Sequence, residues 1–180
     1  DNVLLWKHSN FSEQRINEQV AYLLNYALHK VTKDGTAKQL GLRFTDINLA
    51  GKTGTTNDYR DSWFVGFDRN LLASIWVGDD NNAKTGLTGS SGAMQVYMDF
   101  QFQMEPKSLS RRFPAGLEIA HFNAQTGAQM LAGCPGSISL PAISSGLTEQ
   151  VLSCSGSKVN KPKPVQPKHK SWWERILGSL

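Results

Sequence analysis

AGKTGTT, residues 50–56, is the most informative stretch of this 180-residue sequence. It lies in a strand-like segment, so Thr53 and Thr55 are expected on one face, where they offer two hydroxyl groups. Gly54 leaves room for another backbone beside the strand. Lys52 adds a positive charge that favours a carboxylate. The stretch therefore predicts a strand that presents a cation, two hydroxyls and a bare glycine to the acidic end of a ligand.

The segments on either side of this stretch predict a small antiparallel sheet. Strand candidates cover residues 47–56, 62–68 and 71–78, and the short connection 68–70 joins the last two. Strands joined in sequence by short loops favour antiparallel pairing. A further short strand is expected at residues 3–6.

Helices are predicted before and after these strands. Asn17 is a suitable N-cap, Asp34-Gly35 is a stop, and a short helical turn is expected over 36–40, ending at Gly41. The first helix carries an apolar face formed by Val20, Leu23, Leu24, Ala27, Leu28 and Val31. A second helix is expected over 90–104, with Met94, Tyr97, Met98 and Phe100 or their neighbours inward. The order predicts an α+β fold with both helices on one face of the sheet.

The composition changes after Pro106. We expect residues 1–105 to form one domain portion, 106–157 a small, irregular, β-rich appendage, and 158–180 a basic Pro/Lys linker with a short amphipathic end. Trp172, Trp173, Ile176 and Leu177 share one helical face in residues 171–180. That end could contact a membrane or a protein partner, or could be marginal structure.

The charges are unevenly distributed along the chain. The net charge is +4, and residues 158–180 hold six basic residues and one glutamate, which leaves the rest at −1. A near-neutral body does not favour nucleic-acid binding, whereas a basic tail suits an acidic surface such as anionic lipid. A solvated tail without a partner is equally consistent. The start of the sequence lacks the pattern of a signal peptide, so any anchor or export signal is expected upstream.

Two cysteines, Cys134 and Cys154, are too far apart for a Cys-x-x-Cys redox pair. The four histidines are scattered and predict no metal site. A Cys134–Cys154 disulfide in an oxidising compartment is the favoured interpretation, and two free thiols in a cytosolic protein are the alternative.

Lys52-Thr53-Gly54 matches one signature of the serine acyl-transfer enzymes, which include penicillin-binding proteins and β-lactamases. The run 31–40, residues 49–57, and the stretches 61–64, 76–82 and 89–94 resemble, in the same order, the transpeptidase domain of class A penicillin-binding proteins. The cysteine pair and the Trp-containing end resemble the 1B type. The resemblance implies a partial penicillin-binding-protein/β-lactamase-like fold.

The resemblance also implies roles for individual residues. Lys52 would supply the active-site charge, and the backbone N–H of Thr55 would be one oxyanion-hole donor. Thr53, Gly54, Thr55 and Thr56 would bind substrate. Members of the family also use a Ser-x-x-Lys nucleophile and a Ser-x-Asn relay that precede Lys-Thr-Gly. Neither precedes it here, and the one Ser-x-x-Lys match, at Ser155 and Lys158, follows it in a linker-like region that offers no rigid support.

The resemblance implies a fragment of a bifunctional peptidoglycan synthase, with a glycosyltransferase upstream and a D-Ala-D-Ala transpeptidase that β-lactams acylate. We expect the fragment alone to be inactive and to need the preceding part of the same protein. The expected partners are stem peptides and the lipid-linked precursor, without a cofactor, at the periplasmic face of the bacterial inner membrane. The alternatives are a β-lactamase-like hydrolase fragment and a non-catalytic module that binds peptidoglycan or membrane.

Overall fold

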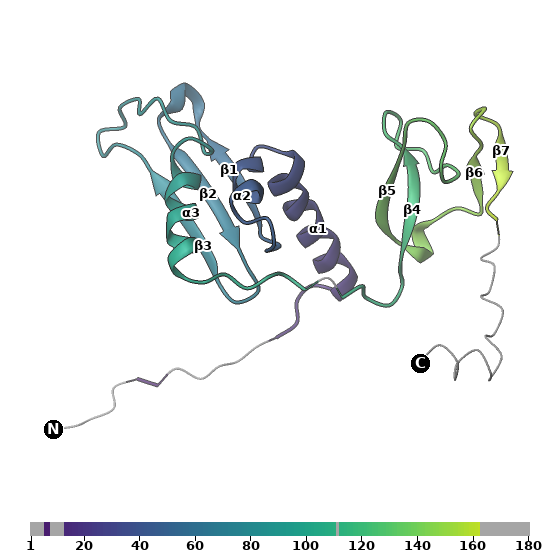
Figure 1. Ribbon diagram of the computed structural model, residues 1–180, viewed down its shortest axis with the longest axis horizontal. Helices are drawn as coiled ribbons and strands as arrows, with labels where there is room; N and C mark the ends of the chain where they lie inside the picture. Colours follow the sequence, from purple (N-terminus) through teal and green to yellow (C-terminus); the bar gives the residue numbers. More distant parts are fainter. Residues whose placement is uncertain (1–5, 8–12, 111, 163–180) are drawn as a thin grey trace, which may run out of the picture. The chain divides into compact units, whose positions relative to one another are not determined.

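The computed structural model describes residues 6–7, 13–110 and 112–162. Most of the strand expected at 3–6 and the end expected at 171–180 lie outside these residues. The chain forms two compact units, one up to Ala115 and one from Gly116, and each is described by itself (Figure 1). Among the described residues, no helix has the length and apolar character needed to cross a membrane.

The first unit is built on a three-stranded antiparallel sheet in the order β1-β2-β3 (Figure 1). The strands are β1 (Ala50–Thr55), β2 (Ser62–Phe67) and β3 (Leu72–Val77). The predicted antiparallel arrangement is confirmed. β1 begins three residues later than expected because α1 holds the chain at Leu49, whose carbonyl oxygen lies 2.7 Å from His29 Nδ1 and 3.1 Å from Thr32 Oγ1.

Helix α1 (Glu18–Asp34) has the predicted ends. Asn17 accepts a hydrogen bond from the backbone N–H of Gln19, and Gly35 closes the helix by donating to the Val31 carbonyl. The expected apolar face is not buried along its whole length. Val20 and Leu24 are about half exposed, at 48% and 52%, whereas the polar Thr32 is buried. The helix is therefore packed mainly through its C-terminal half.

Helix α2 (Lys38–Arg43) lies two to three residues later than the turn expected over 36–40. The prediction that Gly41 ends it was wrong, since Gly41 lies inside the helix. A Cβ at Gly41 would come within 2.0 Å of the Thr32 carbonyl oxygen. Glycine is required there because α1 and α2 approach each other closely.

Helix α3 (Ala93–Gln103) packs on the sheet face that carries Phe64, whose ring centroid lies 4.8 Å from that of Tyr97. Met94, Tyr97 and Met98 are buried as expected, and at the fourth expected position the neighbouring Gln101 is buried, whereas Phe100 itself is 36% exposed. The core of the unit consists of side chains from α2, β2, α3 and the segments next to α2 and before β1: Ala37, Leu40, Phe44, Leu49, Phe64, Ala93, Met94, Tyr97 and Met98.

The two long helices do not share one face of the sheet, contrary to expectation. Val65 and Phe67 alternate with Phe64 along β2 and so lie on the opposite face. Leu24 and Leu28 of α1 border a groove with these two residues. Thus α1 runs beside β1 and reaches the face opposite α3.

Residues 106–115 belong to the first unit, although the expected domain portion ended at 105. The segment is held by hydrogen bonds from Leu109 N to the Asn48 carbonyl (2.9 Å) and from Lys107 N to Asp68 Oδ2 (2.7 Å). At its end, Gln19 Nε2 donates to the Ala115 carbonyl at 2.8 Å. Because of these contacts, the first unit extends ten residues beyond the expected boundary at 105.

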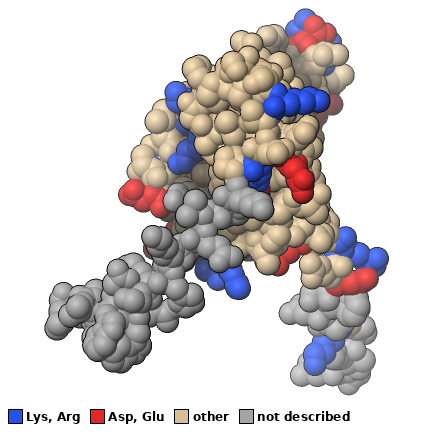
Figure 2. Space-filling view, turned by 90° about the vertical axis from the view of Figure 1, so that its right-hand side faces the viewer, with Lys and Arg blue, Asp and Glu red and all other residues tan. Residues whose placement is uncertain are grey.

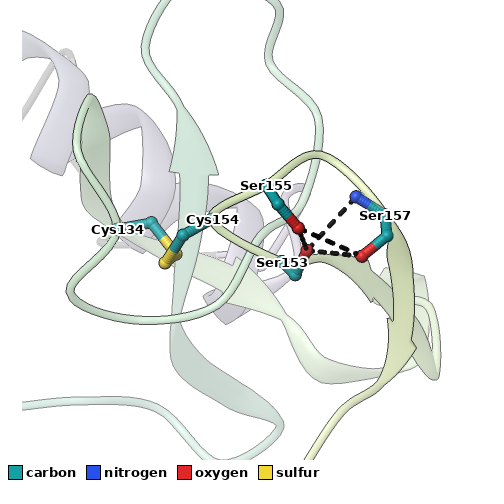
Figure 3. Close-up of a disulfide and its surroundings, with 5 residues drawn as sticks. All are labelled: Cys134, Ser153, Cys154, Ser155 and Ser157. Carbon is teal, nitrogen blue, oxygen red and sulfur yellow. Dashed lines mark hydrogen bonds between the residues drawn. A yellow bond between two sulfur atoms is a disulfide. The ribbon is translucent and has the colours of Figure 1, made fainter.

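The second unit contains two antiparallel pairs, β4 (Leu117–Asn123) with β5 (Ser137–Ile143) and β6 (Gln150–Leu152) with β7 (Lys158–Asn160). A 3-10 turn at Ser144–Gly146 follows β5. Cys134 and Cys154 form a disulfide (Figure 3). Residues 158–160, expected to begin the linker, instead form β7. On the face drawn in Figure 2, acidic and basic side chains are interspersed among a larger uncharged area.

Candidate active site

β1 is an edge strand, with β2 on one side and no strand on the other among the described residues. The N–H of Thr56, just beyond β1, donates to the Asp61 carbonyl on the β2 side at 3.1 Å. Successive backbone groups of a strand point to opposite sides. The N–H of Thr55 and the C=O of Thr53 therefore face the free edge.

Lys52 is exposed and brings its charge to this free edge. Its Nζ donates to the Thr53 carbonyl oxygen at 2.9 Å. Lys52 also borders a groove of about 520 Å³ that α1 and the opposite face of the sheet enclose. Thr53 and Thr55 are not among the residues that line this groove, so the free edge and the groove meet at Gly51 and Lys52.

Thr53 and Thr55 share the face of β1 that carries Phe64 on the neighbouring strand, as their spacing predicts. Neither hydroxyl is isolated. Thr53 Oγ1 lies 2.7 Å from Thr36 Oγ1, and Thr55 Oγ1 accepts a hydrogen bond from the Gly89 N–H at 2.9 Å. Two hydroxyls and one cation thus approach the same edge from opposite faces of the strand.

Gly54 lies opposite Trp63 of β2. A Cβ at Gly54 would come 3.1 Å from the Trp63 Cβ, and one at Gly89 would come 2.6 Å from the Gly54 carbonyl oxygen. Trp63 therefore leaves little room for a side chain at position 54. The closeness of Gly89 to the Gly54 carbonyl oxygen also requires a small residue at position 89.

The end of the β1–β2 hairpin is fixed by Asp61. Thr56 Oγ1 donates to Asp61 Oδ2 at 2.9 Å and accepts from the Asp61 N–H at 2.8 Å, while Trp76 Nε1 donates to Asp61 Oδ1 at 2.9 Å. A 3-10 turn, Asn57–Tyr59, spans the gap. Thr56, predicted to bind substrate, has its hydroxyl hydrogen directed at Asp61.

The sequence did not single out Thr36, Gly89 or Asp61 as parts of this arrangement. Each lies in a stretch that carries the family resemblance, and this was the available signal. Among the described residues, no group of three or more His, Cys, Asp or Glu side chains gathers to hold a metal ion.

Ser155, the serine of the Ser-x-x-Lys match, lies on the exposed turn between β6 and β7 in the second unit (Figure 3). Its Oγ lies 2.9 Å from Ser153 Oγ and 3.4 Å from Ser157 Oγ. Lys158, the lysine of the match, is in a strand, whereas a nucleophilic serine needs its lysine one helical turn away.

Comparison with known proteins adds the family. The Penicillin binding protein transpeptidase domain matches residues 5–93. This chain belongs to the penicillin-binding protein transpeptidase family. The matched residues include all of β1. They also include Thr36 and Gly89, which contact the two threonines of β1.

Several penicillin-binding proteins are similar to the chain. Penicillin-binding protein 1B of Vibrio cholerae is 41% identical over 128 residues, which cover 71% of this chain and 16% of that protein. Penicillin-binding protein 1B of Escherichia coli is 39% identical over 110 residues, which cover 61% of this chain and 13% of that protein. The matched part of the chain thus spans between about one eighth and one sixth of the length of these relatives.

The fold agrees with that of a solved penicillin-binding protein. The crystal structure of Penicillin-Binding Protein 1A from Haemophilus influenzae matches with a TM-score of 0.62 at 24% identity, over 71% of this chain and 20% of that one. The predicted α+β, penicillin-binding-protein-like fold is therefore confirmed.

Proposed function

We propose that this chain supplies the carboxylate-binding wall of a serine transpeptidase that cross-links peptidoglycan stem peptides. One observation carries the proposal: β1 is an edge strand that brings Lys52, the hydroxyls of Thr53 and Thr55, and the Thr55 N–H to one open edge. The family match over residues 5–93 and the relatives named above support the reaction class.

Each group on the edge has a distinct task in this reaction. Lys52 attracts the terminal carboxylate of a D-Ala-D-Ala stem peptide, and the two threonine hydroxyls donate hydrogen bonds to it. The Thr55 N–H stabilises the negative charge that develops on the attacked carbonyl oxygen. Gly54 lets the peptide backbone lie along the strand, and Thr56 holds the hairpin end.

The covalent step needs a serine from the preceding part of the complete protein. Its hydroxyl oxygen attacks the D-Ala-D-Ala carbonyl carbon, the peptide bond breaks, and D-Ala leaves with the proton. An amino group of a neighbouring stem peptide then attacks the acyl-enzyme and releases the serine. A β-lactam carries a similar carboxylate and amide, so it acylates the same serine. The 180-residue chain alone is inactive in this scheme.

The rest of the transpeptidase domain would cover the sheet face opposite Phe64. That face exposes four large apolar side chains in this chain, Trp63, Val65, Leu72 and Trp76. A glycosyltransferase domain upstream would use the lipid-linked precursor. The Cys134–Cys154 disulfide suits an oxidising compartment, which supports a location at the periplasmic face of the inner membrane.

The test uses the full-length protein that contains this chain. Lys52→Ala should slow acylation by labelled penicillin by on the order of a hundredfold, because the carboxylate loses its cation, while polymerisation of glycan strands continues. Acylation is measured as the second-order rate of labelling.

Two control variants address the competing Ser-x-x-Lys match. Ser155→Ala and Lys158→Ala should leave the labelling rate unchanged. Normal labelling of Lys52→Ala would remove Lys52 from the site, and loss of labelling in Ser155→Ala would place the nucleophile in the second unit instead.

A further inference from the structure

Thr36 lies next to the threonine that the proposed function assigns to the substrate carboxylate. Its Oγ1 is 2.7 Å from Thr53 Oγ1, a normal hydrogen-bond distance between hydroxyls. The two residues are 17 positions apart and come from different elements, the turn after α1 and strand β1. The contact between Thr36 and Thr53 therefore forms only when the turn after α1 packs against β1.

The direction of this hydrogen bond matters for binding a carboxylate. A hydroxyl has one hydrogen to donate, and an ionised carboxylate has none. If Thr53 donates to Thr36, it has no hydrogen left for the ligand. When Thr53 binds a carboxylate, the hydrogen between the two oxygens must therefore come from Thr36.

The backbone around Thr36 is fixed on both sides. The N–H groups of Gly35 and Ala37 both donate to the Val31 carbonyl, at 3.1 and 3.2 Å, and Ala37 is fully buried. A Cβ at Gly35 would come 2.9 Å from Val31 Cα. The exposed Thr36 side chain thus projects from a rigid turn, which favours a single orientation of its hydroxyl oxygen.

Thr55 shows the same arrangement by a separate route. Its Oγ1 accepts the backbone N–H of Gly89 at 2.9 Å, so its own hydrogen is free to donate outward. An N–H can only donate, which fixes the direction of this second bond. Both threonines of β1 therefore have a neighbour outside the strand that can occupy their acceptor side.

We propose that Thr36 is a positioning residue: its hydroxyl donates to Thr53 and thereby keeps the Thr53 hydrogen directed at the substrate carboxylate. This inference rests on the proposed function, because it requires that Thr53 bind the carboxylate. Thr36 itself touches neither the substrate nor the reacting atoms. It acts on Thr53 as the Gly89 N–H acts on Thr55.

The experiment compares variants of the full-length protein in the penicillin acylation assay. Thr36→Val keeps the shape of the side chain and removes its hydroxyl, so the rate should fall about three- to tenfold, the effect of one modest hydrogen bond. Thr36→Ser keeps the hydroxyl, and its rate should stay within about twofold of the wild type.

A double-mutant cycle separates positioning from a structural role. If Thr36 acts through Thr53, adding Thr36→Val to Thr53→Val should slow acylation no further. A rate for Thr36→Val equal to the wild type overturns the inference. So does a further loss in the Thr53→Val background.

The remaining outcomes are also decisive. If Thr53→Val itself acylates normally, the carboxylate role of Thr53 fails, and the proposed function is revised at that residue. Thermal melting checks the fold of every variant. If Thr36→Val melts clearly below the wild type, Thr36→Ala takes its place with the same criteria.

Discussion

The carboxylate of Asp68 joins two parts of the first unit. It is buried, and it accepts backbone N–H bonds from Asn70 and Leu71 at 2.7 and 2.6 Å and from Lys107 at 2.7 Å. Burial by itself raises the pKa of Asp68, but the three donors favour the charged form, and the pKa lies below the usual value of 3.8. One side chain therefore fixes the β2–β3 turn and the segment after α3.

The lowered pKa predicts acid-sensitive stability. The folded-state pKa lies below the unfolded value, so the contribution of Asp68 is present above about pH 4 and is lost as the pH falls through the folded pKa. Asp68→Asn should lower the free energy of unfolding at pH 7 by about 1–3 kcal/mol and flatten its decrease below pH 4. Denaturant titrations between pH 2 and 7 measure both.

The exposed Asp80 provides the matched control for Asp68. Asp80→Asn should change the free energy of unfolding by less than about 0.5 kcal/mol. An Asp68→Asn profile that runs parallel to the wild type across the acid range would contradict the role given to this carboxylate.

At the same residue scale, the sequence predicted the groups on β1 and missed those that support them. The two-residue period of a strand fixes Thr53 and Thr55 on one face without any tertiary information. Thr36 and Gly89 are 17 and 34 residues distant from their partners, and these contacts depend on how α1 and the 88–92 loop pack. In α3 the buried Met94, Tyr97, Met98 and Gln101 follow the helical spacing i, i+3, i+4 and i+7, which leaves the apolar Phe100 outside this face and brings the polar Gln101 into it.

At the scale of elements, the close crossing of α1 and α2 depends on Gly41. The hypothetical Cβ contact of 2.0 Å is with a backbone carbonyl, which cannot move aside as a flexible side chain can. The sequence analysis interpreted Gly41 only as a helix stop, because glycine commonly ends helices. That interpretation was wrong, since the close contact with Thr32 depends on tertiary packing, which residue type does not show.

Gly41→Ala should therefore destabilise the first unit, although alanine favours helix more than glycine does. We expect a loss of about 1–3 kcal/mol, because the backbones of α1 and α2 must separate. Gly146→Ala is the control, since nothing lies within 4 Å of a Cβ there, and its melting temperature should stay near that of the wild type. A Gly41→Ala variant as stable as the wild type would show that the helices do not cross this closely.

Other element boundaries followed from local chemistry. Asn17 and Gly35 mark the ends of α1 as expected, because capping hydrogen bonds form within a few residues of each other. The start of β1 and the extension of the unit to Ala115 depend on contacts with distant residues. Local signals therefore predicted the elements, and long-range contacts set where several of them begin and end.

For the whole molecule, the division after Ala115 predicts that reduction affects one unit and spares the other. The disulfide links Cys134, before β5, to Cys154, after β6, across 20 positions. The entropy of a closed loop of this size stabilises the folded form by about 3 kcal/mol. Ser153, Ser155 and Ser157 form hydrogen bonds beside Cys154, so the β6–β7 turn should be disturbed as well (Figure 3).

Reductant should lower the melting temperature of the second unit and leave the amide spectrum of residues 18–110 unchanged. Two-dimensional NMR with and without reductant measures both effects. The variant with Cys134→Ser and Cys154→Ser should match the reduced protein and no longer respond to reductant. A uniform change across both units would contradict their independence.

The outward direction of the Thr55 N–H affects how easily mutation can produce resistance to an inhibitor. This donor belongs to the main chain, so eighteen of the nineteen replacements that a mutation can make at position 55 keep it, and only proline deletes it. A compound that gains its affinity from this N–H is therefore difficult to evade by changing that codon. Under the proposed function, escape variants should appear first at positions whose side chains make the contact.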